Sequence, residues 1–175
     1  MSKVEVIQET GLTEEDHIQI STLLDRSFKT DFKGRSYFLQ PHHFRVVWRD
    51  GQILGHAGLI LRRVLLDDQE IEILGLCDVA VSPDVRKTGI ASALVERAIE
   101  IARDLPVQFF ALFGTENLYK TAGFEPVNNQ IIWFDMEDGP SREIRRGGKQ
   151  DLMVLELGMT KWNSQGALDL LGFKF

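Results

Sequence analysis

The residues best suited to chemistry form a turn between an apolar strand and a helix. The turn ends at Gly89, and an apolar pattern of helical spacing begins at Ile90. The first N–H groups of a helix lack internal partners and lie at the positive end of its dipole, so they bind anions such as a pyrophosphate. Gly89 would leave these donors uncovered, and Arg86 and Lys87 add positive charge. The turn therefore predicts a phosphate-binding site.

Alternatively, this segment is an ordinary solvated turn. Gly89 is then only a turn residue, and Arg86-Lys87 is a solvated corner of the surface. Two better-known phosphate sites are excluded. The segment lacks G-x-x-x-x-G-K-[S/T], so it is not a nucleotide P-loop, and it lacks G-x-G-x-x-G, which argues against a Rossmann dinucleotide site.

Other reactive side chains precede the turn. Asp78 interrupts a mainly apolar strand, where partial desolvation is expected to raise the pKa of its carboxyl; alternatively, it caps a neighbouring element or pairs with an arginine. Cys77 is expected to be a small core residue rather than a nucleophile. We expect His42, His43 and His56 to be ordinary surface or strand residues, because no carboxylate spacing nearby completes a metal site. No metal is predicted.

The elements that position these residues follow from the apolar pattern. Thr13 is typical of a helix N-cap, followed by acids in the first turn. The segment 29–41 has no clear period and is predicted to be a short helix or an aromatic loop. Strands are predicted where apolar and polar residues alternate or apolar runs lie between turn signals. They cover residues 4–7, 44–48, 53–64 and 71–81, with turns at Asp50-Gly51 and Asp67-Asp68.

After the turn, an amphipathic helix of about four turns is followed by a nearly unbroken apolar strand, Val107–Phe113. With the strand before the turn, they form a β-α-β unit with parallel strands. A short helix at 116–121 leads to Gly123, which suits a left-handed C-cap. Two closing strands (131–136 and 152–157) flank a polar loop at 137–149. The sequence predicts one α/β domain over residues 1–175.

Composition excludes several classes of protein. The chain has 175 residues, 43% of them hydrophobic, and a single cysteine, so no intramolecular disulfide is available and a cytoplasmic location is expected. The net charge of −6 argues against a general nucleic-acid binder. The N-terminal residues 1–11 carry no apolar run typical of a secretory signal, and the longest apolar runs are too short to cross a bilayer. Neither nucleic acid nor membrane is expected as a partner.

Three segments together resemble one family. Arg86-Lys87-Thr88-Gly89-Ile90-Ala91 fits the pattern R/Q-x-x-G-x-G/A of the GNAT superfamily of N-acetyltransferases. The preceding Asp78–Pro83 resembles the strand that enters this motif, and Leu118–Phe124 resembles the family's L-Y-x-x-x-G-F segment. The resemblance covers residues 4–157. It implies a mixed, mostly antiparallel sheet with a central parallel β-α-β unit, flanked by helices.

A fainter similarity concerns the acceptor. Gly55-His56-Ala57-Gly58, followed by Arg62-Arg63 and the Asp67-Asp68 turn, is similar to aminoglycoside 2′-N-acetyltransferases and nodulation N-acyltransferases. The sequence also departs from the family pattern, because the Asn that usually precedes the Tyr by several residues is missing and Asn117 lies nearer.

The resemblance implies acetyl-CoA as cosubstrate, bound between the strand that ends at Val81 and the strand Val107–Phe113. In members of the family, backbone groups of the first strand pair with the pantetheine arm, and N–H groups of the turn hold the pyrophosphate. Carried over to this sequence, the cofactor-binding residues are Val79, Ala80, Val81, Arg86, Lys87, Thr88, Gly89, Ile90, Ala91 and Ser92.

The resemblance also implies a direct attack of an amine on the thioester. An amine is mostly protonated at pH 7, so a base is needed, and Asp78 is the candidate. A backbone N–H near Val79 would stabilise the tetrahedral oxyanion. Tyr119 matches the tyrosine that protonates the leaving thiolate; the alternative is a core aromatic residue with its hydroxyl at the surface.

The acceptor is expected to be an amine of a small molecule or a protein. Its binding site is expected to be formed by residues 28–41 and by the closing strands, with Phe32, Tyr37, Phe38 and Trp133 as aromatic walls. The apolar C-terminal tail at 159–175 is expected to dock on the domain or on a second subunit, as in a homodimer. A non-catalytic acyl-CoA-binding regulatory domain is the alternative function. Such a domain would need neither Asp78 nor Tyr119.

Overall fold

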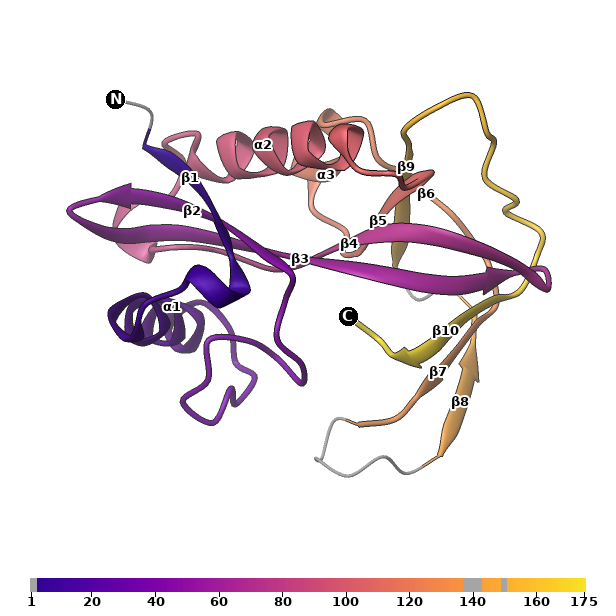
Figure 1. Ribbon diagram of the computed structural model, residues 1–175, viewed down its shortest axis with the longest axis horizontal. Helices are drawn as coiled ribbons and strands as arrows, with labels where there is room; N and C mark the ends of the chain where they lie inside the picture. Colours follow the sequence, from indigo (N-terminus) through magenta and orange to yellow (C-terminus); the bar gives the residue numbers. More distant parts are fainter. Residues whose placement is uncertain (1–2, 137–142, 149–150) are drawn as a thin grey trace. The chain divides into compact units, whose positions relative to one another are not determined.

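The computed structural model describes residues 3–136, 143–148 and 151–175. It has the mixed α/β architecture that the sequence predicts. Contacts divide the chain into two compact units: unit 1 comprises residues 1–60 and 76–100, and unit 2 comprises residues 61–75 and 101–175. Strands β3 (Gln52–Leu66) and β4 (Gln69–Val81) and helix α2 (Ile90–Asp104) each contribute to both units (Figure 1).

Unit 1 begins with β1 (Val4–Gln8), the short 3-10 helix η1 (Glu9–Gly11), α1 (Glu14–Ser27) and β2 (Phe44–Asp50). β2 is antiparallel to both β1 and β3, with Val46 opposite Val6 and Val47 opposite His56. The predicted turn after Asp50 is confirmed, since Gly51 has a φ of 72°. The segment between α1 and β2 forms no regular helix or strand, which agrees with the aromatic loop.

Local chemistry explains how α1 begins. Thr13 accepts a hydrogen bond from the N–H of Asp16, and the Asp16 carboxylate accepts one from the N–H of Thr13, which completes a capping box. The predicted N-cap is therefore confirmed. The apolar face of α1 joins the core of unit 1, whose buried members are Ile20, Leu23, Leu24, Phe32, Val47, Ile53 and Ala80.

The strands follow one another along the sheet in the order β6-β9-β5-β4-β3-β10-β7-β8. All of them belong to unit 2 except the parts of β3 and β4 that lie in unit 1. The further elements of unit 2 are β5 (Phe109–Phe113), α3 (Asn117–Thr121), β6 (Glu125–Pro126), β7 (Ile131–Phe134), β8 (Ile144–Gly147), β9 (Leu152–Glu156) and β10 (Leu168–Phe173). β9 is antiparallel to β5 and β6, whereas β10 is parallel to β7, so the sheet is mixed. β4 and β5, which α2 connects, are neighbours, as the predicted β-α-β unit requires.

One prediction for unit 2 is wrong. Residues 144–147, expected in a polar loop, form β8 and pair with β7 in antiparallel register. Strand formation depends on cross-strand neighbours more than on intrinsic preference, so pairing with β7 makes a strand of this polar segment despite Gly147. The expected loop residues 137–142 and 149 lie outside the described residues.

The C-terminal tail supplies β10, which pairs with β3 and β7, and its Leu168 and Leu170 are fully buried. The Asp67-Asp68 turn adopts left-handed φ values of 52° and 64°, a conformation that Asp tolerates better than most residues. Gly123, with a φ of 98°, follows α3 as predicted. No helix in the described part of the chain is both long and apolar enough to span a membrane.

Candidate active site

The turn for which the sequence predicts phosphate binding leads from the end of β4 into α2. It contains the 3-10 helix η2 (Pro83–Val85), and Lys87 and Gly89 adopt left-handed φ values of 63° and 87° on either side of Thr88. Left-handed residues in a turn can direct successive N–H groups toward one side, the arrangement found in anion-binding concavities. The helical hydrogen bond from the N–H of Ala93 to the Gly89 carbonyl spans 3.0 Å, so the N–H groups of residues 90–92 precede it.

Charge in the turn favours an anion. Asp84 is paired with Arg26 at 2.8 Å, which neutralises its carboxylate. Arg86 and Lys87 are exposed and make no ion pair within the described residues. The Arg86 Nε donates to the Val81 carbonyl at 3.4 Å, so this side chain folds back along the end of β4. A Cβ built at Gly89 meets no atom within 4 Å, so the space in front of the turn is open. The turn can therefore receive a phosphate.

A glycine of β3 positions the start of α2. A Cβ built at Gly55 would lie 2.7 Å from the Ile90 Cγ2 and 3.0 Å from the Leu94 Cδ1. Only a residue without a side chain allows α2 to approach β3 this closely. Because Ile90 is the first residue of the helix, Gly55 sets where the free N–H groups lie.

Tyr119 belongs to unit 2 and lies in α3. Its ring is partly buried and packs edge-on against Phe124, with ring centroids 6.3 Å apart. Burial, together with the nearby Glu116 carboxylate, raises the pKa of Tyr119 to about 12. The hydroxyl therefore stays protonated at neutral pH, as a proton donor must. A Cβ built at Gly114 would lie 3.0 Å from the Tyr119 ring, so Gly114 makes room for it.

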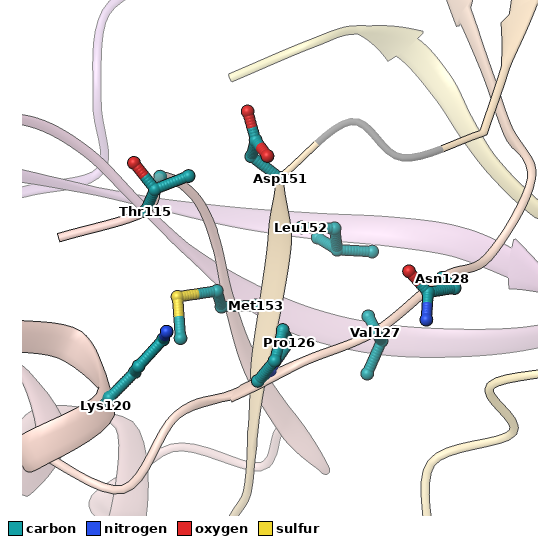
Figure 2. Close-up of a pocket in the computed structure, with 9 residues that line it drawn as sticks. Thr115, Lys120, Pro126, Val127, Asn128, Asp151, Leu152 and Met153 are labelled. Atoms are coloured by element: carbon teal, nitrogen blue, oxygen red, sulfur yellow. The ribbon is translucent and has the colours of Figure 1, made fainter. Parts of the chain in front are cut away.

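A pocket of about 250 Å³ lies in unit 2, beside Gly114 and α3 (Figure 2). Lys120 of α3 and Asp151, which precedes β9, bring one ammonium and one carboxylate group to its lining. Thr115 and Asn128 add uncharged polar groups. The remaining lining residues are Gly114, Pro126, Val127, Leu152 and Met153. The pocket thus offers opposite charges over an apolar floor to a small ligand. Sequence analysis did not predict it.

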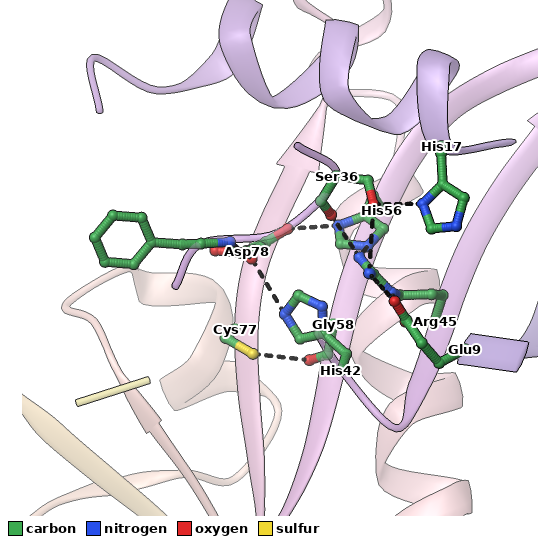
Figure 3. A network of polar contacts seen from close by, with 10 residues as sticks. Glu9, His17, Ser36, His42, Arg45, His56, Gly58, Cys77 and Asp78 are labelled. Atoms are coloured by element: carbon green, nitrogen blue, oxygen red, sulfur yellow. Dashed lines mark hydrogen bonds and ion pairs between the residues drawn. The ribbon is translucent and has the colours of Figure 1, made fainter. Parts of the chain in front are cut away.

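Asp78 has an unusual conformation for a residue within a strand. Its φ is 50°, so β4 is locally distorted just before Val79. Its carbonyl accepts a hydrogen bond from the His56 Nδ1 at 2.8 Å. Its carboxylate oxygen Oδ2 accepts from the N–H of Phe38 at 3.1 Å and from the His42 Nε2, also at 3.1 Å (Figure 3). Asp78 thus connects β4 with β3 and with the segment before β2.

The expected direction of the Asp78 pKa shift is wrong. Burial does raise the pKa of this carboxyl, but the hydrogen bonds from His42 and Phe38 favour the ionised form. The net effect lowers the pKa of Asp78 below its ordinary value. The carboxylate is therefore ionised at neutral pH, the form that a proton acceptor requires, although its affinity for a proton is lower than that of an ordinary aspartate.

The expectation that the histidines are ordinary surface or strand residues is wrong for His42, which is buried outside any strand, whereas His43 is at the surface and His56 lies in β3. His42 is 4% exposed and His56 is completely buried, although His43 is exposed. Burial and the Arg45 charge lower the pKa of His56 to about 3. Burial also lowers the pKa of His42, against the opposing effect of Asp78. Both rings are neutral at pH 7. Asp78, whose carboxylate contacts His42, is 36 positions away in the sequence, so no local pattern indicates this contact.

Arg45 was not predicted either; among the described residues it is the largest fully buried side chain. Its guanidinium donates to both oxygens of Glu9, at 2.7 and 2.9 Å, and to the Ser36 carbonyl at 2.6 Å. It further donates to the His56 Nε2 at 3.1 Å, which leaves His56 with its proton on Nδ1 (Figure 3). A buried charge needs this degree of pairing. The available signal was an arginine inside the apolar strand Phe44–Trp48.

The other predicted residues are distributed as follows. Phe32 is buried in the core of unit 1, and Phe38 is partly buried against that core. Tyr37 is partly buried, and Trp133 lies in unit 2. Cys77 is partly buried, and its thiol donates to the Gly58 carbonyl at 3.6 Å. Within the described ranges, no group of three or more His, Cys, Asp or Glu residues is arranged to hold a metal ion. Unit 1 contains Asp78 and every predicted cofactor-binding residue; unit 2 contains Tyr119.

Comparison with protein families identifies this architecture. The model of an acetyltransferase (GNAT) domain matches residues 10–127, which is more than half of the chain. The chain therefore belongs to the GNAT acetyltransferase family. A comparison with curated proteins finds no match.

Solved structures show the same fold. A GNAT family acetyltransferase from Brucella melitensis, in complex with acetyl-CoA, is 18% identical, with 96% of each chain covered and a TM-score of 0.61. The N-acetyltransferase YhbS from Escherichia coli, in complex with CoA, is 17% identical, with 97% of this chain and 91% of that chain covered and a TM-score of 0.63. ElaA from Escherichia coli is 18% identical, with 89% of this chain and all of that chain covered and a TM-score of 0.62.

Proposed function

We propose that the protein is an N-acetyltransferase that transfers the acetyl group of acetyl-CoA to an amine by direct attack. The observation that carries the proposal is the turn before α2, in which left-handed Lys87 and Gly89 present free N–H groups to open space. Membership of the GNAT family and the acetyl-CoA and CoA bound by two proteins of similar fold support it.

Acetyl-CoA would bind through the main chain more than through side chains. In this proposal the pyrophosphate accepts hydrogen bonds from the N–H groups of residues 87–92, and Arg86 and Lys87 add favourable charge. The pantetheine arm pairs with backbone groups of residues 79–81. The Ala80 side chain is buried in the core of unit 1, which agrees with a role for its backbone alone.

The reaction then needs one proton acceptor and one proton donor. The Asp78 carboxylate takes the proton of the ammonium, and the free amine attacks the thioester carbonyl. The N–H of Val79 donates to the oxyanion of the tetrahedral intermediate. When the C–S bond breaks, the Tyr119 hydroxyl gives its proton to the thiolate of CoA. The nitrogen loses its second proton to solvent as the amide forms, and the Tyr119 hydroxyl and the Asp78 carboxylate are restored by proton exchange with solvent. The pKa shifts leave Asp78 ionised and Tyr119 protonated, which are the forms that these roles require.

A thermal-shift experiment tests the binding part of this proposal. Ligand at 100 times its Kd stabilises a protein by about 2.7 kcal/mol, which for a chain of this length raises Tm by roughly 5–10 °C. We expect acetyl-CoA and CoA to produce this shift, whereas NAD and ATP should not. Equal shifts with all four compounds, or none with acetyl-CoA, would contradict the proposal.

Release of the CoA thiol tests catalysis. The purified protein is mixed with acetyl-CoA and a panel of amines that includes aminoglycosides, polyamines and peptides with a free N-terminus or lysine. We expect amine-dependent thiol release that disappears in Asp78→Asn. A thermal shift without thiol release for any amine would favour the alternative, a non-catalytic acyl-CoA-binding regulatory domain.

A further inference from the structure

His42 is a buried residue outside the predicted site. Its ring is 4% exposed and lies against the backbone of Gly58 in β3. A Cβ built at Gly58 would overlap the ring, with the Cε1 only 2.9 Å away. The absence of a side chain at position 58 therefore creates the space in which the imidazole is held. The ring is held on its other side by its contact with Asp78.

The hydrogen bonds define the protonation state of this ring. A carboxylate oxygen only accepts, so the His42 Nε2, which lies 3.1 Å from the Asp78 Oδ2, carries the proton. The Nδ1 is buried and has no hydrogen-bond partner within the described residues. The charged and titratable groups around the ring are Asp78 from β4, Arg45 from β2, His56 from β3 and Glu9 from η1. Burial and, to a smaller extent, the Arg45 cation oppose a second proton on the ring, so His42 is a neutral donor.

Both donors to the Asp78 carboxylate use the same oxygen. The Phe38 N–H and the His42 Nε2–H each bind Oδ2, and no group of the described residues donates to Oδ1. The carboxylate is thus held from one side, in a residue whose backbone is already fixed in a left-handed conformation. The second oxygen keeps its lone pairs for a proton that arrives from elsewhere.

We infer that His42 is a positioning residue for proton transfer: its Nε2–H holds the Asp78 Oδ2, so that Oδ1 remains the oxygen that accepts the proton of the amine. The inference rests on the proposed function, because it assigns a hydrogen-bond donor to Asp78, the base of the proposed reaction. His42 itself neither gains nor loses a proton during turnover. It orients the carboxylate and keeps it ionised where burial alone would favour the protonated acid.

Three substitutions separate this role from mere packing. His42→Gln keeps an amide donor at a similar reach, His42→Asn has a donor that is too short, and His42→Leu has none. We expect the acidic limb of the pH profile of kcat/KM to move to higher pH in His42→Leu and His42→Asn, because the Asp78 carboxyl then remains buried without its donor. The loss in kcat/KM should grow as the pH falls through the acidic limb, and reach at least about 10-fold where the Asp78 carboxyl is protonated in the variant but still ionised in the wild type. His42→Gln should recover most of that loss.

The exposed neighbour His43→Leu is the matched control and should keep the wild-type profile. The thermal shift with acetyl-CoA should be unchanged in all four variants, so a loss of cosubstrate binding is distinguished from a loss of proton transfer. An unmoved acidic limb and a kcat/KM within 2-fold of wild type in both His42→Leu and His42→Asn would overturn the inference.

A measurement that needs no turnover covers the case in which the proposed function itself fails. The pKa of the Asp78 carboxyl can be followed by ¹³C NMR titration of the side chain, assigned with Asp78→Asn. We expect a higher pKa in His42→Asn than in the wild type and a value close to wild type in His42→Gln. The same pKa in His42→Asn and in the wild type would refute a role for His42 in holding the carboxylate. Because His42→Asn and His42→Gln are both polar, the comparison does not depend on tolerance of leucine.

Discussion

Gly55 of β3 lies directly against Ile90, the first residue of α2, so close that a Cβ at Gly55 would be 2.7 Å from the Ile90 Cγ2. This contact lies within unit 1 and sets the height of the helix start above the sheet. The free N–H groups of the proposed phosphate site belong to that first turn. A packing contact between two apolar residues therefore positions a polar site.

The first prediction is that Gly55→Ala weakens acetyl-CoA binding although the added methyl group does not contact the cosubstrate. The added methyl group must displace Ile90 or Leu94, and overpacking of this kind costs about 1–3 kcal/mol of stability. A displaced helix start should raise the Kd for acetyl-CoA by roughly 10-fold, or about 1.4 kcal/mol, in isothermal titration calorimetry. Gly11→Ala is the matched control, because its Cβ would meet only Ile7 at 3.7 Å. Equal Kd values in the two variants would contradict the prediction.

The second prediction concerns Gly89. Gly89→Glu places an L residue at a φ of 87° and a carboxylate in front of the anion-binding N–H groups. We expect the Kd for CoA to rise by at least about 10-fold. Gly51→Glu is the control, since Gly51 has a similar φ of 72° and equally open space in the β2–β3 turn. If both variants bind CoA as the wild type does, the phosphate site lies elsewhere.

The third prediction tests Tyr119 as the proton donor. Tyr119→Phe keeps the ring that packs on Phe124 but removes the hydroxyl, so kcat for thiol release should fall roughly 10²-fold where proton transfer limits the rate. With the pKa of Tyr119 at about 12, loss of its proton should not reduce the rate between pH 6 and 10. An unchanged kcat in Tyr119→Phe removes this residue from the mechanism.

The fourth prediction is that acid destabilises the protein through His56. The pKa of His56 is about 3 in the folded protein and near 6.5 when unfolded, so between these values the unfolded chain binds the extra proton. Stability therefore falls as pH decreases from 6.5 toward 3, by up to about 1.4 kcal/mol per pH unit from this group. His42, whose pKa is also lowered, acts in the same direction.

Urea unfolding at a series of pH values measures this dependence. His56→Gln should be less stable than the wild type at pH 7, because the Arg45 and Asp78 contacts to the ring are lost. Its free energy of unfolding should nevertheless depend less steeply on pH between 6.5 and 4. A slope identical to that of the wild type would show that His56 does not cause the acid sensitivity.

Local signals in the sequence were sufficient for much of the fold. Thr13 and Asp16 form the predicted cap within a single helical turn, and Gly51 and the Asp67-Asp68 pair reverse the chain where turn chemistry indicated. The helix after Gly89 and the strand before it follow from apolar periodicity. These features depend on residues within a few positions of one another, which is why sequence patterns report them. By contrast, β8 depends on pairing with β7 and was missed.

The sequence by itself determined the family motif and hence the strand, turn and helix that carry the proposed cosubstrate site. The polar environment of Asp78 was decided by tertiary structure alone. Its partners Phe38, His42 and His56 are 40, 36 and 22 positions away along the chain, and they meet it because β2, β3 and β4 bring them together. The direction of a pKa shift depends on which donors reach a buried carboxylate, and no pattern of neighbouring residues encodes that.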